Sequence, residues 1–382
     1  MLAYGRQTIE DDDIAAVAEA LRGDFLTTGP TVEAFEQAFA ETVGARHAVA
    51  CANGTAALHL AMLALDVQPG EMVIAPSITF LATANCARFV GAEVVFADVD
   101  PDTGLMTPDT LAQAMQRLDG RRLRAVLPVH LRGDVAELPA LQSLAAASGA
   151  VLVEDAPHAL GSTMRFGNRE ERVGDCAHSA MATFSFHPVK TIATGEGGMV
   201  TTHDDGSAAR LRALRSHGMV RPADADPWWY EMPEIGFNYR LPDILCALGL
   251  SQLAKLPRFA ARRRALTSRY EALLAPLSPL VRPATRPDWS DPVLHLMTVL
   301  IDFDAAGRSR RQVVEALKAE GIGTQVHYIP VHTQPYYRAR YGELDLPGAQ
   351  AWYDRCLSLP LFPGMADGDV ERVVEALRRA LG

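Results

Sequence analysis

Short apolar segments alternate with helix-like segments through the first two-thirds of the chain. The apolar segments at 47–51, 72–76, 92–99, 124–130 and 150–156 have the length and composition of strands, and further strand-like runs follow at 179–184 and 198–202. Helical periodicity appears between them, near 54–66, 79–90, 108–117 and 137–149. Strands separated by helices form βαβ units. The pattern therefore predicts an α/β fold with a mostly parallel sheet that helices cover on both faces.

The regular alternation of strands and helices ends near residue 240. Two helix-like segments come first, then a Pro-rich stretch, an apolar strand at 293–303, a helix around 309–320 and an aromatic-rich segment at 325–337. A last helix repeats Val and Leu on one face, at Val370, Val373, Val374, Leu377 and Leu381. We expect a large domain over residues 14–250 and a smaller C-terminal α+β domain over 251–382 that also includes residues 1–13.

Charge and composition exclude several classes of function. Among 382 residues, 46 are acidic and 36 basic, and a formal net charge of −10 argues against nucleic-acid binding. No stretch reaches the roughly 18 apolar residues of a membrane span, and the opening residues have no signal-peptide pattern. Five scattered cysteines without a CxxC motif fit a reducing compartment and predict no metal site. We expect a cytoplasmic protein without a membrane partner.

Ligands of open parallel sheets bind beyond the carboxyl ends of the strands, so the residues there are the first candidates. Asn53-Gly54-Thr55 follows a strand and opens a helix, where backbone amides can bind phosphate, although an ordinary N-cap turn is the favoured interpretation of this motif alone. Asp155 ends the most apolar strand, which is compatible with a solvated carboxylate or with one paired to a buried cation. His158 taken alone is more typical of a loop histidine with satisfied hydrogen bonds than of a catalytic group.

Lys190 is the candidate nucleophile. Only three of the 36 basic residues are lysines, and Lys190 lies in the Pro- and Gly-rich segment SFHPVKTIATGEGG. Desolvation in such a turn lowers the pKa of a lysine and suits it to Schiff-base chemistry, although a lysine that caps carbonyls is the structural alternative. Lys255 and Lys318 lie in helix-like segments, and we expect both to be solvated.

Together these weak signals specify one chemistry. A Schiff-base lysine, a carboxylate for a pyridinium nitrogen and a phosphate cradle are the protein's share of a pyridoxal phosphate site. Phe80, after another strand, is placed to stack on the ring or to fill the core.

The sequence resembles the DegT/DnrJ/StrS sugar aminotransferases, which have the aspartate aminotransferase (type I) fold. The resemblance runs through NGTAAL (53–58), PSITFLATAN (76–85), EDAPHALGS (154–162), FSFHPVKTIATGEGGMV (184–200) and GFNYRLPDILCALGLSQL (236–253). LTTGP (26–30), RSHGM (215–219) and QVHYIPVH (325–332) continue it, so that it covers essentially the whole chain.

The resemblance implies a role for each matched position. Lys190 would form the Schiff base, Asp155 would keep the pyridine nitrogen protonated and Phe80 would stack on the ring. Gly54, Thr55 and Ser185 would bind the phosphate, and His158 would lie near the ring hydroxyl, where many members have glutamine. Asn238 would reach the phosphate from the partner subunit, which implies a homodimer with shared active sites. L-glutamate would be the amino donor.

The resemblance also suggests the second substrate. SFH…K, RSHGM and QVHY look most like the transaminases of pseudaminic acid biosynthesis, which act at C4 of a UDP-linked 4-keto-6-deoxy-N-acetylhexosamine. Perosamine-type and bacillosamine-type relatives stay open, because HLRGD (130–134) and EDAPH depart from the common pattern. The nucleotide diphosphate must be offset locally in an acidic protein. The candidate substrate contacts are Thr28, Gly29, His187, His217, Arg240, His327 and Tyr328. Arg215 is also a candidate, although a solvated salt bridge is the favoured interpretation.

Three other functions are compatible with parts of this pattern, and specific residues argue against each. A nicotinamide oxidoreductase would share the α/β pattern, but no GxGxxG follows the first strand. The sugar dehydratases of the family have histidine in place of the lysine, whereas Lys190 is present here. Retention of both Asp155 and Lys190 argues against a non-catalytic relative.

Overall fold

A seven-stranded sheet forms the centre of the molecule. The computed structural model describes residues 1–167 and 169–382. The strand order is β1-β9-β8-β5-β4-β2-β3, in which β9 is antiparallel to both of its neighbours and all other adjacent pairs are parallel. The strands are β1 (His47–Cys51), β2 (Met72–Pro76), β3 (Glu93–Ala97), β4 (Leu123–Val126), β5 (Val151–Asp155), β8 (Met181–Ser185) and β9 (Gly198–Thr202).

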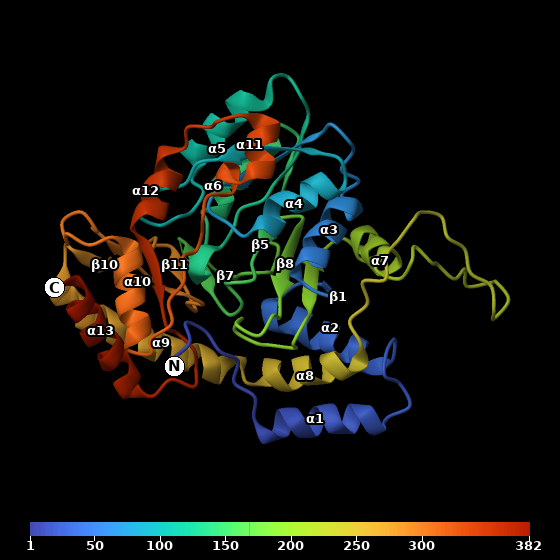
Figure 1. The fold of residues 1–382 in the computed structure, drawn as a ribbon. Coiled ribbons are helices and arrows are strands. Elements are labelled where there is room, and N and C mark those ends of the chain that lie inside the picture. Colours follow the sequence, from blue (N-terminus) through green and yellow to red (C-terminus); the bar gives the residue numbers. More distant parts are fainter. Residues whose placement is uncertain (168) are drawn as a thin grey trace.

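Helices cover both faces of this sheet (Figure 1). One core cluster joins one face to α2 (Pro30–Val43), α5 (Pro108–Met115), α6 (Leu138–Ala147) and α8 (Asp243–Ala254). A second cluster joins the other face to α3 (Gly54–Ala64), α4 (Leu81–Phe89) and α7 (Asp205–Leu214). The α/β fold with a mostly parallel sheet is therefore confirmed, and the strands are buried almost throughout because helices cover them on both sides.

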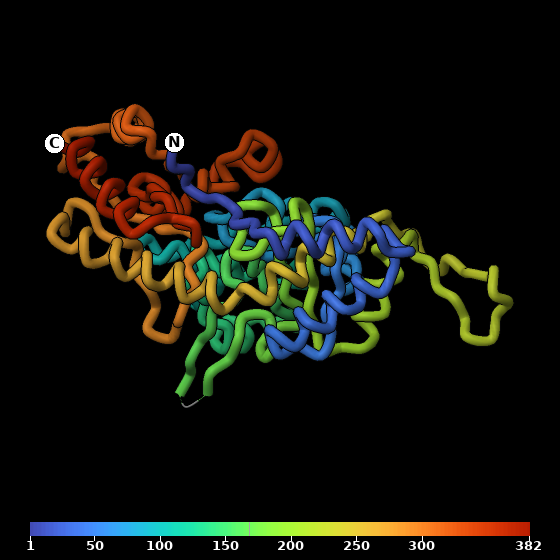
Figure 2. Tube along the Cα trace, turned by 90° about the horizontal axis from the view of Figure 1, so that it is seen from below, coloured from blue at the N-terminus to red at the C-terminus, as the bar shows by residue number. Residues whose placement is uncertain are grey.

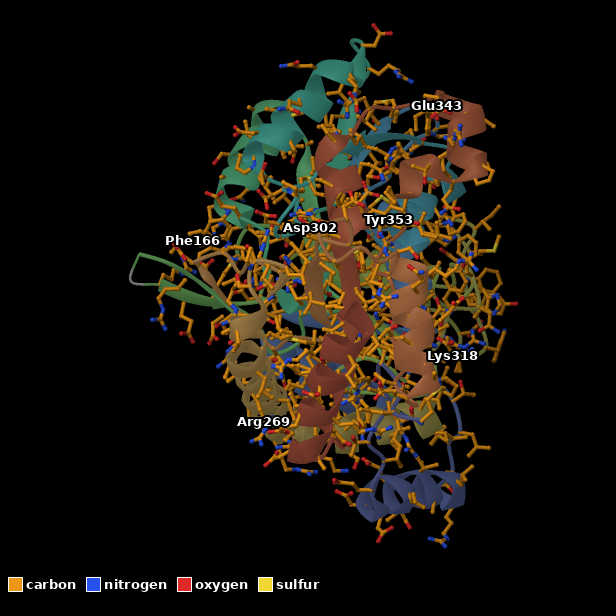
Figure 3. All side chains as sticks on the ribbon, turned by 60° about the vertical axis from the view of Figure 1, so that its left-hand side comes forward. Phe166, Arg269, Asp302, Lys318, Glu343 and Tyr353 are labelled. Carbon is orange, nitrogen blue, oxygen red and sulfur yellow. The ribbon has the colours of Figure 1, made fainter. Side chains whose placement is uncertain are left out.

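A second, smaller sheet organises the C-terminal part. It is antiparallel, in the order β10-β12-β13, and a third core cluster lies between it and its helices. Its elements are β10 (Val281–Pro283), β12 (Met297–Ile301), β13 (Cys356–Leu359), α9 (Leu256–Leu274), α10 (Arg310–Ala319) and α13 (Asp367–Leu381). Figure 3 views this part from outside, with Lys318 at the surface on α10, solvated as predicted. The apolar stripe predicted for the last helix is buried.

The domain boundary at residue 250 stays a prediction. The helices α11 (Pro335–Tyr341) and α12 (Pro347–Arg355) contribute Tyr337 and Trp352 to the core on the α3 side of the large sheet. A three-stranded sheet also joins β11 (Ser290–Asp291) to the hairpin of β6 (Thr163–Phe166) and β7 (Arg169–Arg172). This hairpin extends from the body in Figure 2. The two parts thus share packing on both sides of the boundary.

The N-terminal helix α1 (Asp11–Arg22) packs along α8 (Figure 2). Its helical period was predicted correctly from Ile14, Val17 and Leu21, yet Ile14 and Leu21 are exposed. Polar contacts hold the helix instead. Lys255 donates to Asp12 at 2.7 Å and forms an ion pair with Asp13 at 2.6 Å.

The prediction that Lys255 is solvated was therefore wrong. Its side chain is only 8% exposed, because it lies at the junction of α8 and α9, beneath the carboxylates of the N-terminal segment. That segment lies far away in sequence, so local periodicity carried no sign of it.

None of the described helices is both long and apolar enough to cross a membrane. Among residues 1–167 and 169–382, no three His, Cys, Asp or Glu side chains are grouped so as to hold a metal ion.

Candidate active site

One cavity of about 850 Å³ lies at the edge of the large sheet where the parallel strands end, and the small domain closes its other side. Most of the predicted site residues line it together. They are Gly54, Thr55, Phe80, Asp155, His158, Ser185, His187, Lys190, His327 and Tyr328. Strand topology explains this convergence, because β1, β8 and β5 all end at this edge.

A helix N-terminus forms one end of the cavity. Asn53 caps α3 by accepting the Ala56 amide at 2.9 Å, so the amides of Gly54 and Thr55 are the first-turn donors that remain without an intrahelical acceptor. A Cβ atom at Gly54 would lie 2.7 Å from Cβ of Ser185, so only glycine fits this close approach of α3 to β8. Amides, the Thr55 hydroxyl and the Ser185 hydroxyl form a donor set suited to a phosphate.

Asp155 lies at the floor of the cavity, at the end of β5. It is 6% exposed, and its Oδ2 accepts a hydrogen bond of 2.5 Å from the Thr83 hydroxyl, which is in turn 2.6 Å from the Thr79 hydroxyl. Burial raises the pKa of Asp155, while the Thr83 hydrogen bond and the positive charge of Lys190 act in the opposite direction. A buried cation beside this carboxylate would stabilise its charged form.

Lys190 lies in the turn after β8, as the glycines and the proline predicted. Its amide donates to the His187 carbonyl at 2.8 Å, which closes the turn. Burial lowers the pKa of Lys190 to about 8, although Asp155 opposes the shift. The amine is therefore neutral in a large fraction of molecules near pH 8, as a nucleophile or a general base must be.

Neutral imidazoles line another side of the cavity, where His158 follows β5 and His295 and His327 come from the C-terminal part. Burial lowers the pKa of His158 and of His295 well below the ordinary value, and that of His327 to about 3. The rings of His158 and His295 stack with centroids 4.6 Å apart. Nδ1 of His327 lies 2.9 Å from the Ser358 hydroxyl, and its carbonyl accepts from the Trp352 indole at 3.0 Å.

The other predicted residues do not line this cavity in the described chain. They are Thr28, Gly29, His217, Asn238 and Arg240. The Gly29 amide already donates to Asp243 at 2.9 Å, and Asn238 is exposed and bridges to Ser216. Arg215 forms the predicted salt bridge, but it is half-buried against Glu36 and not solvated.

Thr83, His295 and Tyr4 are among the cavity residues that the sequence patterns did not predict. The four-residue spacing of Thr79 and Thr83 in a buried segment is the sequence pattern that could have indicated Thr83. His295 lies within an apolar run and gave no polar pattern. Tyr4 enters because the N-terminal segment returns to the small domain, where its carbonyl accepts the Leu361 amide.

Comparison with known proteins agrees with this geometry. The model of the DegT/DnrJ/EryC1/StrS aminotransferase family matches residues 7–378. The chain belongs to this family.

Several solved structures resemble the chain over nearly its full length. Helicobacter pylori PseC, an aminotransferase involved in the biosynthesis of pseudoaminic acid, is 29% identical with a TM-score of 0.90, covering 100% of this chain and 99% of that one. The aminotransferase TlmJ from Streptoalloteichus hindustanus is 32% identical with a TM-score of 0.90 and the same coverage. DesV from S. venezuelae, solved in complex with a ketimine intermediate, is 33% identical with a TM-score of 0.86 and covers 99% of each chain.

The predicted family and its type I fold are thus confirmed. Members are pyridoxal phosphate-dependent aminotransferases, and the Gly54 cradle, the buried Asp155 and the low-pKa Lys190 fit that cofactor.

Proposed function

We propose that this protein is a pyridoxal phosphate-dependent aminotransferase that moves an amino group from L-glutamate to C4 of a nucleotide-linked 4-keto-6-deoxy sugar. The observation that carries the proposal is the arrangement of Lys190, Asp155 and the Gly54 cradle around one cavity. The likeness to PseC supports a UDP-linked N-acetylhexosamine as the sugar.

The cofactor would be held by groups from three strand ends. Amides of Gly54 and Thr55 and the Ser185 hydroxyl would bind its phosphate, and Asp155 would pair with the ring nitrogen. Phe80, which is 57% exposed although apolar, would stack on the ring. When bound, pyridoxal phosphate supplies an electron sink that lets an amino group pass between an amino acid and a ketone.

Lys190 would act twice. Its Nζ would first bond the cofactor, and once displaced by the amino donor it would take a proton from Cα of glutamate. It would return that proton to the carbonyl carbon of the cofactor, and hydrolysis would then release the keto acid and leave the amino group on the cofactor. The same steps in reverse would aminate the sugar. The buried Asp155 would remain ionised through its pairing with the ring nitrogen, while Thr83 holds its Oδ2 in place.

The negative charge of the substrates has to be offset by cations that lie outside this cavity. Among the described residues that line it, Lys190, Asp155 and Glu196 are the ones with acidic or basic side chains apart from the histidines. A nucleotide diphosphate and glutamate are anions, so further cations are required. We propose that His217, Asn238 and Arg240, with the Thr28–Gly29 turn, serve the site of a neighbouring copy in a homodimer.

The segment between α7 and α8 supports such a dimer. It extends away from the body in Figure 1, and it exposes Trp228, Trp229, Met232 and Ile235. Apolar side chains in an extended arm are typical of an interface. A cytoplasmic location fits the five cysteines, which are buried free thiols.

A substrate screen tests the function. Purified protein with pyridoxal phosphate should be yellow and should bleach when L-glutamate is added. Mass spectrometry of UDP-, GDP- and dTDP-linked 4-keto sugars should then detect a one-amine product, with the UDP-linked N-acetylhexosamine turned over fastest. Preference for a GDP- or dTDP-linked sugar would replace the proposed acceptor, and colourless protein would refute the cofactor.

A further inference from the structure

The ring of His158 is held by contacts at both of its nitrogens. The Arg132 amide donates to Nδ1 at 3.3 Å, and Nε2 lies 3.2 Å from the Tyr328 hydroxyl oxygen. His295 stacks on the ring at 4.6 Å, with 30° between the ring planes. The ring is 5% exposed, so its hydrogen bonds are made to protein groups and the cavity.

These contacts determine which nitrogen carries the proton. Burial and the positive charge of Lys190 lower the pKa of His158, so the imidazole is neutral and carries a single proton. Nδ1 accepts the Arg132 amide and therefore has no proton of its own. The proton lies on Nε2, which donates to the oxygen of Tyr328.

The hydroxyl proton of Tyr328 must then point elsewhere. Burial raises the pKa of Tyr328, so the hydroxyl keeps its proton at every working pH. Within the described chain, His158 is the one hydrogen-bonding partner found for this oxygen, and Tyr328 lines the cavity. The proton is thus available to an acceptor inside the cavity.

The order of the strands indicates which acceptor it meets. Along the sheet edge, the Gly54 cradle and Ser185 follow β1 and β8, Asp155 ends β5, and Arg132 follows β4. In pyridoxal phosphate, the phosphate arm and the ring oxygen flank the carbonyl carbon on opposite sides. With the phosphate at the β1 and β8 end, the ring oxygen would face the end where His158 and Tyr328 lie.

Arg132 anchors this arrangement. Its backbone has φ +65°, and its buried guanidinium bonds Asp134 and donates to the Thr285 carbonyl at 3.0 Å. Its own carbonyl accepts the His295 amide at 2.6 Å. One residue therefore places both stacked imidazoles, which gives the unusual HLRGD segment a role.

We propose that Arg132 is a positioning residue that fixes His158 in the tautomer protonated at Nε2, and that the Tyr328 hydroxyl, as a result, donates its proton to the ring oxygen of the cofactor. The second half rests on the proposed function, whereas the first half does not.

The tautomer is measured without cofactor. Protein labelled with ¹⁵N-histidine gives two-bond ¹H–¹⁵N correlations that separate protonated from bare ring nitrogens, and the spectrum of His158→Gln identifies the His158 signals. We expect a protonated Nε2 and a bare Nδ1. A proton on Nδ1, or on both nitrogens at neutral pH, would overturn the proposal even in a protein that binds no cofactor.

The Tyr328 hydroxyl is tested by cofactor binding and absorbance. A donor to the ring oxygen stabilises the deprotonated form of that oxygen. Tyr328→Phe should therefore weaken cofactor binding about tenfold, and it should raise by about one pH unit the midpoint of the pH titration that follows the absorbance of the bound cofactor. Tyr4→Phe removes a hydroxyl from the same wall that does not touch His158, and should change neither value.

His158→Gln completes the set, because glutamine can accept from Arg132 and donate to Tyr328. It should keep the midpoint within a few tenths of a unit. An unchanged midpoint in Tyr328→Phe would refute the proposed hydrogen bond from Tyr328 to the ring oxygen. A midpoint shift in His158→Gln as large as that in Tyr328→Phe would refute the role given to His158.

Discussion

The buried Lys255 and the half-buried Lys190 have opposite surroundings. Lys255 forms ion pairs with Asp12 at 2.7 Å and Asp13 at 2.6 Å, and a third carboxylate, Glu10, lies 3.7 Å away. Lys190 has no hydrogen bond from its Nζ within the described residues and interacts only at longer range with Asp155. Lys255 joins α1 to the α8–α9 junction, whereas Lys190 faces the cavity.

The difference shows that hydrogen-bonding partners, more than burial, decide the charge state of these two lysines. Burial acts to lower the pKa of both residues. Hydrogen bonds that Lys255 donates to two carboxylates outweigh the desolvation and raise its pKa, whereas at Lys190 the desolvation dominates. One amine is locked in its charged form as a structural link, and the other is available as a nucleophile.

The largest expected contrast is in turnover. Lys190→Ala should lower kcat by about 10³-fold or more while cofactor still binds, because the variant lacks its proton-transfer group. Lys255→Met should keep kcat within a few-fold at temperatures where it is folded. Steady-state assays of both variants decide the point, and near-normal turnover by Lys190→Ala would assign the base to another residue.

Stability should show the reverse order. Lys255→Met leaves Asp13, which is fully buried, without its cation, and should lower the free energy of unfolding by about 2 kcal/mol in urea titrations. Burial alone would raise the pKa of Asp13, but the hydrogen bonds of Lys255 and Ser251 lower it on balance. The stabilisation is therefore present above the ordinary carboxylate range near pH 4 and is lost at lower pH.

A third change asks whether the space beside Lys190 is a cofactor site. Gly54→Ala places a methyl group against Ser185 and should weaken cofactor binding about tenfold, measured by absorbance titration. Gly368→Ala is the matched control, since Gly368 also lies in a first helical turn but has no atom within 4 Å of the added group. Equal affinities for the two variants would argue against the cradle.

The smallest expected effect is a difference of a few-fold in labelling rates. With a pKa of about 8, Lys190 becomes neutral well below the ordinary lysine range, while Lys255 stays charged above it. In cofactor-free protein, an amine-selective reagent at pH 8 to 9 should modify Lys190 first and Lys255 last, with the exposed Lys318 between them. Peptide mass spectrometry gives the order, and faster labelling of Lys255 than Lys190 would contradict it.

The sequence predicted the sheet-edge side of the site well. Gly54, Asp155, Ser185 and Lys190 each follow or end a strand, so local periodicity and topology together bring them to one edge. The proline and glycines around Lys190 likewise predicted the turn in which this residue lies, because they act locally.

What the sequence missed depends on segments far apart in the chain. Lys255 is buried by the N-terminal segment, and His295 meets His158 only after the small domain packs against the large one. The exposed apolar face of α1 is another such case, because periodicity predicts a helix but not what covers it. Pairing between distant segments has no local signature.

Reductive trapping tests the central claim most directly. The protein is mixed with pyridoxal phosphate, reduced with borohydride, digested and mapped by mass spectrometry. We expect one phosphopyridoxyl group per chain, on Lys190, with Lys255 and Lys318 unmodified. A label on either of those two lysines, or the lack of any stable label, would contradict the account.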